Sequence, residues 1–203
     1  MLFKASLIFS LAVSALALPS AIDTRKTKAA ATAASVLTVQ DYADFQVSDG
    51  VAGNALAEVQ AKFPVRTLLL IPPPINHPLT PVPQIDEDNL AAVSADDLDI
   101  INAARVTAEA AETDAGGFND AIDAAGGTSS AAGKVLQVGK IKNKVLKLKL
   151  EVLALQIQQA QSGKDNSDKI AAEQTKLDTN IKLDEAADGE ESQSVDFEGD
   201  DSD

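Results

Sequence analysis

Three lysines at helical spacing are the residues of this chain best suited to binding chemistry. Lys140, Lys144 and Lys147 are separated by four and three residues, which places them on one side of an α-helix. Their clustering is unusual in a chain whose net charge is −14. Such a face can bind anionic groups of a wall polymer or lipid headgroups. Alternatively, the lysines neutralise acidic faces of the second and last helices, each exposed pair contributing only about 0.2–1 kcal/mol. We favour this second interpretation.

Groups for catalysis are scarce in this sequence. It has no cysteine, so a Cys-His arrangement cannot be assembled. Its single histidine, His77, lies in the proline-rich segment 65–84, which we interpret below as a retained intron, so a Ser-His-Asp arrangement is not expected either. Clustered acids could transfer protons or bind calcium, but none has EF-hand spacing, and a catalytic acid needs burial to acquire a useful pKa. These clusters are Asp86-Glu87-Asp88, Asp96-Asp97-Asp99 and Asp114-Asp120-Asp123. We therefore expect helix caps and solvated surfaces there, and no enzyme activity, catalytic residue, cofactor or metal site.

A glycine-rich segment, 126–135, resembles a phosphate-binding loop at first sight. Five residues rather than four separate Gly127 from Gly133, and Val135 stands where a Ser or Thr would hold magnesium. No strand is expected before the segment, as that motif requires. We therefore expect a turn at the start of a helix and no bound nucleotide.

The three lysines belong to a long amphipathic helix predicted over 134–161. Two adjacent apolar stripes run along it at spacings of three and four residues. One stripe is Val138, Ile141, Val145, Leu148, Val152 and Leu155, and the other is Leu146, Leu150, Leu153 and Ile157. Together they form a face wider than a two-stranded coiled coil needs, so more than one neighbouring helix should cover it. The first stripe also leaves self-association through this helix open.

A first helix is predicted over 38–63, upstream of the central one. Thr38 and Asp41 form a start that is similar to a capping box, and apolar residues then recur at near-helical spacing. Gly50 and Gly53 weaken the middle, where each glycine costs roughly 1 kcal/mol relative to alanine. We expect a kink or a close helix crossing at these glycines.

Two more helices complete the expected fold. Ser94 caps one, whose small residues allow close packing, and Asp165 to Ala187 forms the last. A short amphipathic piece, 118–125, lies between two glycine pairs. The sequence therefore predicts an all-α bundle of about four helices over 36–187, built around a long central amphipathic helix.

The two ends of the chain have a different composition from the domain. Residues 1–17 have the short basic start, apolar stretch and small-x-small ending of a secretory signal, and the apolar run is shorter than the ~20 residues that span a bilayer. Residues 18–35 lack periodicity and are expected to be flexible. Residues 188–203 are acidic and poor in apolar positions, which predicts a disordered tail. We expect an exported, soluble protein with no membrane span.

A proline-rich segment, 65–84, interrupts the domain. It holds six of the eight prolines and the histidine, and it has no acidic residue. One interpretation is a polyproline recognition loop. The other, which we favour, is an intron retained in the coding sequence assigned to the gene, because Val65 codons begin with GT, Gln84 can be encoded CAG, and the length is typical of a short intron. A cDNA sequence across Pro64 and Ile85 decides between them.

Four segments resemble small secreted proteins of filamentous ascomycete fungi. They are VQDYADFQVSDGVAGNALAEVQAKFP, AGGFNDAIDAAGG, LQVGKIKNKVLKLKLEVLALQIQ and EQTKLDTNIKLDEA. The resemblance covers 36–197 except 65–84, where the similar sequences pass directly from Phe-Pro to the acidic stretch. It implies secretion, and it assigns no activity and no functional residue.

These observations favour a secreted, non-catalytic protein that acts by surface interaction. Its expected partner is an unknown extracellular one, a wall polymer or a host protein. The acidic balance argues against nucleic acid, because long-range repulsion would oppose binding. An alternative is an extracellular carrier that holds an amphipathic small molecule between its helices. A carboxylate-based hydrolase would require two buried acids facing one cleft.

Overall fold

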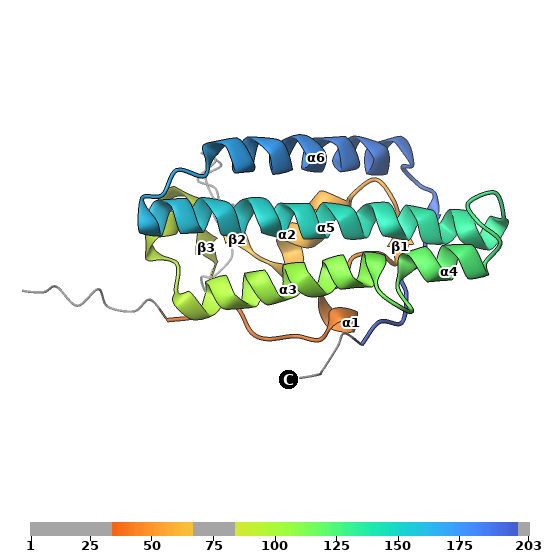
Figure 1. The fold of residues 1–203 in the computed structure, drawn as a ribbon, viewed down its shortest axis with the longest axis horizontal. Helices are drawn as coiled ribbons and strands as arrows, with labels where there is room; N and C mark the ends of the chain where they lie inside the picture. Colours follow the sequence, from red (N-terminus) through yellow and green to blue (C-terminus); the bar gives the residue numbers. More distant parts are fainter. Residues whose placement is uncertain (1–33, 67–83, 199–203) are drawn as a thin grey trace, which may run out of the picture. The chain divides into compact units, whose positions relative to one another are not determined.

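Three helices lie side by side in the domain, as Figure 1 shows. The computed structural model describes residues 34–66 and 84–198. The long helix α5 (Ala131–Ser162) lies between α3 (Ala95–Thr113) and α6 (Ser167–Ala186), and α4 (Phe118–Ala124) packs on the first part of α5. The prediction of an all-α bundle with a long central helix is therefore confirmed.

Short elements fill the space around the central helix. They are α1 (Tyr42–Phe45), β1 (Gly50–Val51), α2 (Ala55–Lys62), β2 (Val65–Arg66), β3 (Ile85–Asp86), the 3-10 helix η1 (Glu87–Ala92) and β4 (Glu191–Ser192). β1 pairs antiparallel with β4, and β2 pairs parallel with β3. The expected signal sequence, most of the expected flexible N-terminus, His77 and residues 199–203 lie outside the described residues.

Both apolar stripes of α5 lie in the core. All of their residues are buried except Ile141, which is half-buried. Ser130 caps the helix by accepting a hydrogen bond from the Gly133 amide at 2.9 Å, and Gly163 ends it in the left-handed conformation with a φ of 70°. Because the same chain covers the first stripe, this stripe does not offer a free surface to a second copy.

The helix α3 packs closely against α5 through small residues. Ser94 Oγ accepts a hydrogen bond from the Asp97 amide at 3.0 Å, which confirms the predicted cap. Ala104, Ala108 and Ala111 are buried at the contact, so the two backbones can approach each other. This close approach brings the longer side chains at the edge of the contact within reach of α5.

The predicted first helix over 38–63 is wrong as a continuous element. It consists of α1 and α2, joined by a turn that contains β1. Gly50 and Gly53 have φ values of 90° and 109°, a conformation that glycine adopts readily and that a helix cannot contain. Asp41, not Thr38, stands at the start of α1, and its side chain makes no capping hydrogen bond.

The prediction of a disordered tail is also wrong for residues 188–198. β4 pairs with β1, and the Ser194 amide donates to Asp49 Oδ1 at 2.8 Å. Phe197 lies edge-on to Tyr42 with 5.9 Å between ring centroids. Gly139 leaves room for this segment, because a Cβ there would lie 2.0 Å from the Gln193 carbonyl oxygen. The acidic composition of the segment concealed these backbone and ring contacts.

The two flanks of the proline-rich segment meet in space. The Ile85 amide donates to the Pro64 carbonyl oxygen at 2.9 Å, and Val65 pairs with Ile85 in the parallel strands. Residues 67–83 lie outside the described residues. The backbones of Pro64 and Ile85 are therefore direct neighbours in space.

Candidate functional site

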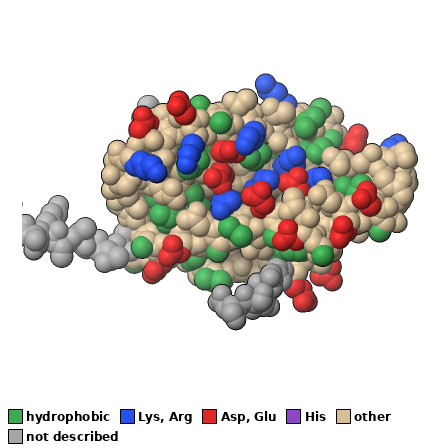
Figure 2. Space-filling model, in the orientation of Figure 1, with side chains coloured by type: hydrophobic (Ala, Val, Ile, Leu, Met, Phe, Trp, Pro, Cys, Tyr) green, Lys and Arg blue, Asp and Glu red, His purple; other side chains and the backbone are tan. Residues whose placement is uncertain are grey.

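A groove lined by charged side chains runs along α5 between α3 and α6. Figure 2 shows basic and acidic side chains gathered across this face of the domain. The groove has a volume of about 390 Å³. Its lining residues are Arg105, Glu109, Glu112, Lys144, Lys147, Leu148, Glu151, Glu173, Lys176 and Asn180. Two of the three lysines predicted from the sequence therefore line it, and the third, Lys140, lies beside them and contacts the same glutamate.

Glu112 of α3 is the common partner of the three predicted lysines. Lys147 Nζ donates to Glu112 Oε2 at 2.9 Å. Lys144 Nζ and Lys140 Nζ lie 3.5 Å and 3.8 Å from Glu112 Oε1. Lys140 also donates to Asn119 Oδ1 of α4 at 2.6 Å. Three cations therefore surround one carboxylate, and the end of the groove near α4 has an excess of positive charge.

The environment of Glu112 keeps its carboxylate ionised. Burial by itself would raise the pKa of Glu112, because it removes water from the charged form. The hydrogen bond from Lys147 and the charges of Lys147, Lys144 and Lys140 outweigh burial, and they hold the pKa below its ordinary value of 4.5. Glu112 therefore stays ionised to a lower pH than an ordinary glutamate does.

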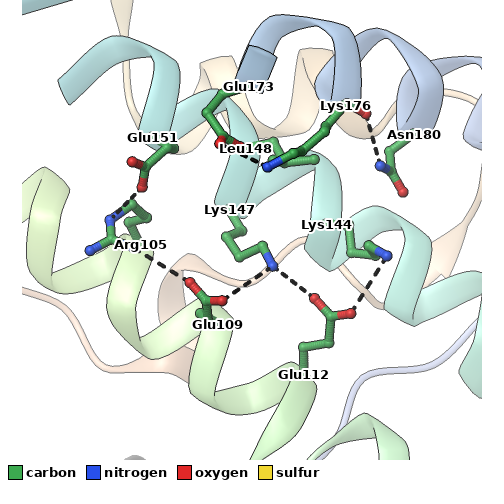
Figure 3. Close-up of a pocket in the computed structure, with 10 residues that line it drawn as sticks. All are labelled: Arg105, Glu109, Glu112, Lys144, Lys147, Leu148, Glu151, Glu173, Lys176 and Asn180. Carbon is green, nitrogen blue, oxygen red and sulfur yellow. Dashed lines mark hydrogen bonds and ion pairs between the residues drawn. The ribbon is translucent and has the colours of Figure 1, made fainter. Parts of the chain in front are cut away.

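The opposite end of the groove has more carboxylates than cations. Arg105 Nε lies 2.9 Å from Glu151 Oε2, and Arg105 Nη1 lies 3.5 Å from Glu109 Oε2. Glu109 also lies 3.8 Å from Lys147 Nζ (Figure 3). One arginine therefore faces two carboxylates here, in contrast to the three lysines around Glu112.

The charged residues of the α6 wall pair within their own helix. Lys176 pairs with Glu173 of the same helix at 2.8 Å, and Asn180 donates to the Lys176 carbonyl oxygen. Among the described residues, no ion pair links Lys140, Lys144 or Lys147 to α6. The expected neutralisation of acidic faces is therefore found for α3 and not for the last helix.

The groove offers ionic binding, because its lining consists of ammonium, guanidinium and carboxylate groups with one leucine and one asparagine. None of the described residues that line it carries a hydroxyl, thiol or imidazole group. Its most buried carboxylate, Glu112, is a weak base because its pKa is lowered. These groups can bind an anion or a mixed-charge ligand through charge-assisted hydrogen bonds.

The clustered acids serve as local backbone partners. Asp86 Oδ1 accepts from the Asp88 amide at 3.0 Å, and Asp120 Oδ2 accepts from the Gly116 amide at 3.0 Å. Within residues 34–66 and 84–198, no group of three or more His, Asp or Glu side chains is arranged to hold a metal ion. The glycine-rich segment follows α4 rather than a strand, and the Gly133 amide already bonds to Ser130.

Asp97 is a buried residue that joins the start of α3 to residues 35–37, whereas the sequence indicated for it only a role in helix capping. It accepts hydrogen bonds from the amides of Val36 and Leu37 and from the hydroxyls of Ser35 and Ser94, at 2.7–2.9 Å for the shortest contact with each. Burial would raise the pKa of Asp97, but these hydrogen bonds lower it from its ordinary value of 3.8. The sequence predicts a flexible segment up to Ser35, but the Ser35 hydroxyl donates to Asp97 Oδ1.

Lys142 is a second residue whose role the sequence did not reveal. It is 0% exposed, on a different side of α5 from Lys140 and Lys144. Its ammonium donates to the carbonyl oxygens of Asp49 and Val51 at 2.8 Å and 2.9 Å, and it pairs with Glu58 at 3.0 Å. Helical spacing could have separated it from the other lysines, because Val138 and Val145 of the first apolar stripe lie four residues before it and three residues after it.

The described part of the chain defines an all-α domain with a charged groove on its long central helix. The family described as Domain of unknown function (DUF8454) matches residues 37–196, so the chain belongs to this family. The match spans the proline-rich segment. No curated protein and no solved structure matches the chain. Every helix in the described ranges is too short or too polar to cross a membrane.

Proposed function

We propose that this protein is a secreted, non-catalytic binding protein of the extracellular space, and that Lys140, Lys144 and Lys147 bind anionic groups of a wall polymer. The observation that carries the proposal is that three lysines share the carboxylate of Glu112, and among the described residues only Lys147 has a second carboxylate partner, Glu109. Lys144 is the most accessible of the three, with a side chain 35% exposed. Its contact with Glu112, at 3.5 Å, is long for a hydrogen bond, so the ammonium keeps donors for a ligand.

The net charge of the chain does not prevent such binding at physiological salt. Charges separated by more than about 8 Å are largely screened at an ionic strength of 0.15 M. The local excess of lysine then determines whether the groove attracts or repels an anion.

The carrier function has weaker support from the geometry. The apolar pocket beside Phe45 and Phe63 has a volume of about 70 Å³. Sites for small molecules are typically about 300–1,000 Å³. The groove that reaches this size is lined mainly by charged side chains, which do not favour an acyl chain.

Binding to an acidic polysaccharide tests the lysine face. Purified full-length protein is titrated with polygalacturonate and, as a neutral control, with dextran. We expect polygalacturonate alone to bind, and the double substitution Lys144→Gln and Lys147→Gln to weaken binding at least tenfold. The double substitution Lys169→Gln and Lys182→Gln removes the same two charges from exposed positions of α6 outside the groove, and it should change affinity less than twofold. Equal losses in both variants would refute a specific site.

Export is tested separately by the intact mass of the protein recovered from culture medium. The expected mass corresponds to a chain that begins at Leu18. The same mass reports whether residues 65–84 are present. Recovery of the protein only from cell extracts, with residues 1–17 retained, would contradict secretion.

A further inference from the structure

We infer that Glu112 occupies, in the free protein, the place that an anionic group of the ligand takes on binding. The inference rests on the proposed function of the lysine face and goes further, because it assigns to Glu112 the role of a competing internal anion. Lys140, Lys144 and Lys147 all lie within 3.8 Å of its two carboxylate oxygens. An incoming anion would meet the same donors, so binding exchanges one anion for another.

The contacts of Glu112 are unequal, and this makes the exchange feasible. Oε2 accepts the short hydrogen bond from Lys147, whereas Oε1 has only the longer contacts with Lys144 and Lys140. An ammonium carries three N–H donors, so Lys144 can turn towards a ligand while Lys147 still holds Glu112. The exchange can therefore begin at Lys144, on the solvent side.

The spacing of the lysines selects the class of ligand. From Lys140 to Lys147 the helix rises about 10 Å, so successive ammonium groups recur at intervals of about 5 Å along α5. A linear chain that bears an anionic group on each unit can contact two or three of them together. A single free carboxylate competes poorly with Glu112, because Glu112 is tethered and acts at a high effective concentration. The ligand class is therefore a linear polyanion of several units.

The opposite end of the groove limits how far such a chain extends. Arg105 there is engaged by Glu109 and Glu151, which would repel a further anion. Lys176 of α6 is paired with Glu173. The ligand is therefore confined to the part of the groove near α4, over the three lysines.

Substitution of Glu112 by glutamine tests the exchange. Glu112→Gln keeps the size of the side chain and removes the competing charge, and Glu185→Gln is the matched control on an exposed position of α6. Titrations use galacturonate and galacturonate oligomers of two to six units. With Glu112→Gln the ligand no longer has to replace an anion that the lysines already hold. One ion pair at about 4 Å that need not be broken corresponds to about a fivefold gain in affinity even with the screening of water. We expect this gain for oligomers with Glu112→Gln, and less than a twofold change with Glu185→Gln.

A measurement on the wild-type chain covers the case in which Glu112→Gln fails to fold. In protein labelled with ¹³C at the glutamate carboxyl carbon, a saturating oligomer should shift the Glu112 resonance and leave that of Glu185 in place. Oligomer binding with an unchanged Glu112 resonance would overturn the exchange. Equal oligomer affinity of Glu112→Gln and wild type would do the same.

Two further outcomes separate this inference from the proposed function. Oligomers that bind neither wild type nor Glu112→Gln would refute the lysine face itself, and the inference with it. A monomer that binds as tightly as the oligomers would leave an anion site in place and overturn the polyanion class.

Discussion

Replacing the buried Lys142 by methionine should lower the free energy of unfolding by about 3 kcal/mol. Its ammonium is enclosed where the turn after α1 meets α5, and it makes three polar contacts there. Methionine has a similar length and no charge, so the substitution removes the contacts without opening a large cavity. The prediction tests whether the buried charge holds the turn on α5.

The size of this loss in unfolding free energy follows from the polar groups that Lys142→Met leaves without their partner. The carbonyl oxygens of Asp49 and Val51 each lose a hydrogen bond from a charged donor, which typically contributes about 1.5–3 kcal/mol. The Glu58 side chain is 37% exposed, so its carboxylate returns to water and adds little. Burial of the methionine recovers about 1–2 kcal/mol. The net loss of about 3 kcal/mol is a large fraction of the 5–15 kcal/mol that is typical of a domain.

Urea denaturation followed by circular dichroism measures this loss. With a typical slope of about 2 kcal/mol per molar urea, the midpoint should fall by about 1.5 M. Lys182→Met is the matched control, because an exposed substitution away from special contacts usually changes stability by less than about 0.5 kcal/mol. If Lys142→Met and Lys182→Met unfold at the same urea concentration, the buried ammonium does not hold the turn, and the reasoning is refuted.

Two other predictions concern acid stability and the proline-rich segment. Because the folded-state pKa of Asp97 is lowered from 3.8, its contribution is complete above about pH 4 and is lost as the pH falls through the folded value. Urea titrations between pH 5 and pH 2 should therefore show a smaller loss of stability on acidification in Asp97→Asn than in wild type; equal losses would contradict this. Deletion of 65–84 removes β2 and its pairing with β3, but it should preserve the helical circular dichroism spectrum, because Ile85 N already lies 2.9 Å from Pro64 O. An unfolded deletion variant would show that the segment is part of the fold.

The elements with regular apolar spacing were predictable from sequence. The stripes of α5 and the cap at Ser94 have local signals, namely a 3.6-residue period and a side chain that bonds within its own turn. The break between α1 and α2 was indicated by Gly50 and Gly53, but its full extent was not, because a glycine lowers helix propensity without showing whether the chain bends or leaves the helix.

The candidate site was only half predictable. Lys140, Lys144 and Lys147 were found because helical spacing places them on one side, and the choice of Glu112 as their common partner was not visible. That choice depends on how far α3 is shifted along α5, which the packing of small residues on α3 decides. Helix periodicity gives the direction of a side chain around its own axis and says nothing of the relative shift of two helices.

The sequence by itself determined the all-α class, the long central helix and the scarcity of catalytic groups, because these depend on composition and local spacing. Only the tertiary structure decided which carbonyl oxygens the buried Lys142 contacts, which carboxylate the other lysines share, and that residues 188–198 pack against the domain. The physical reason is that polar side chains and backbone amides pair with whatever the packed helices bring within about 3 Å. Lys142 and Lys144 are two residues apart on one helix, and they face different neighbours: one is sealed against two carbonyl oxygens, and the other lines an open groove.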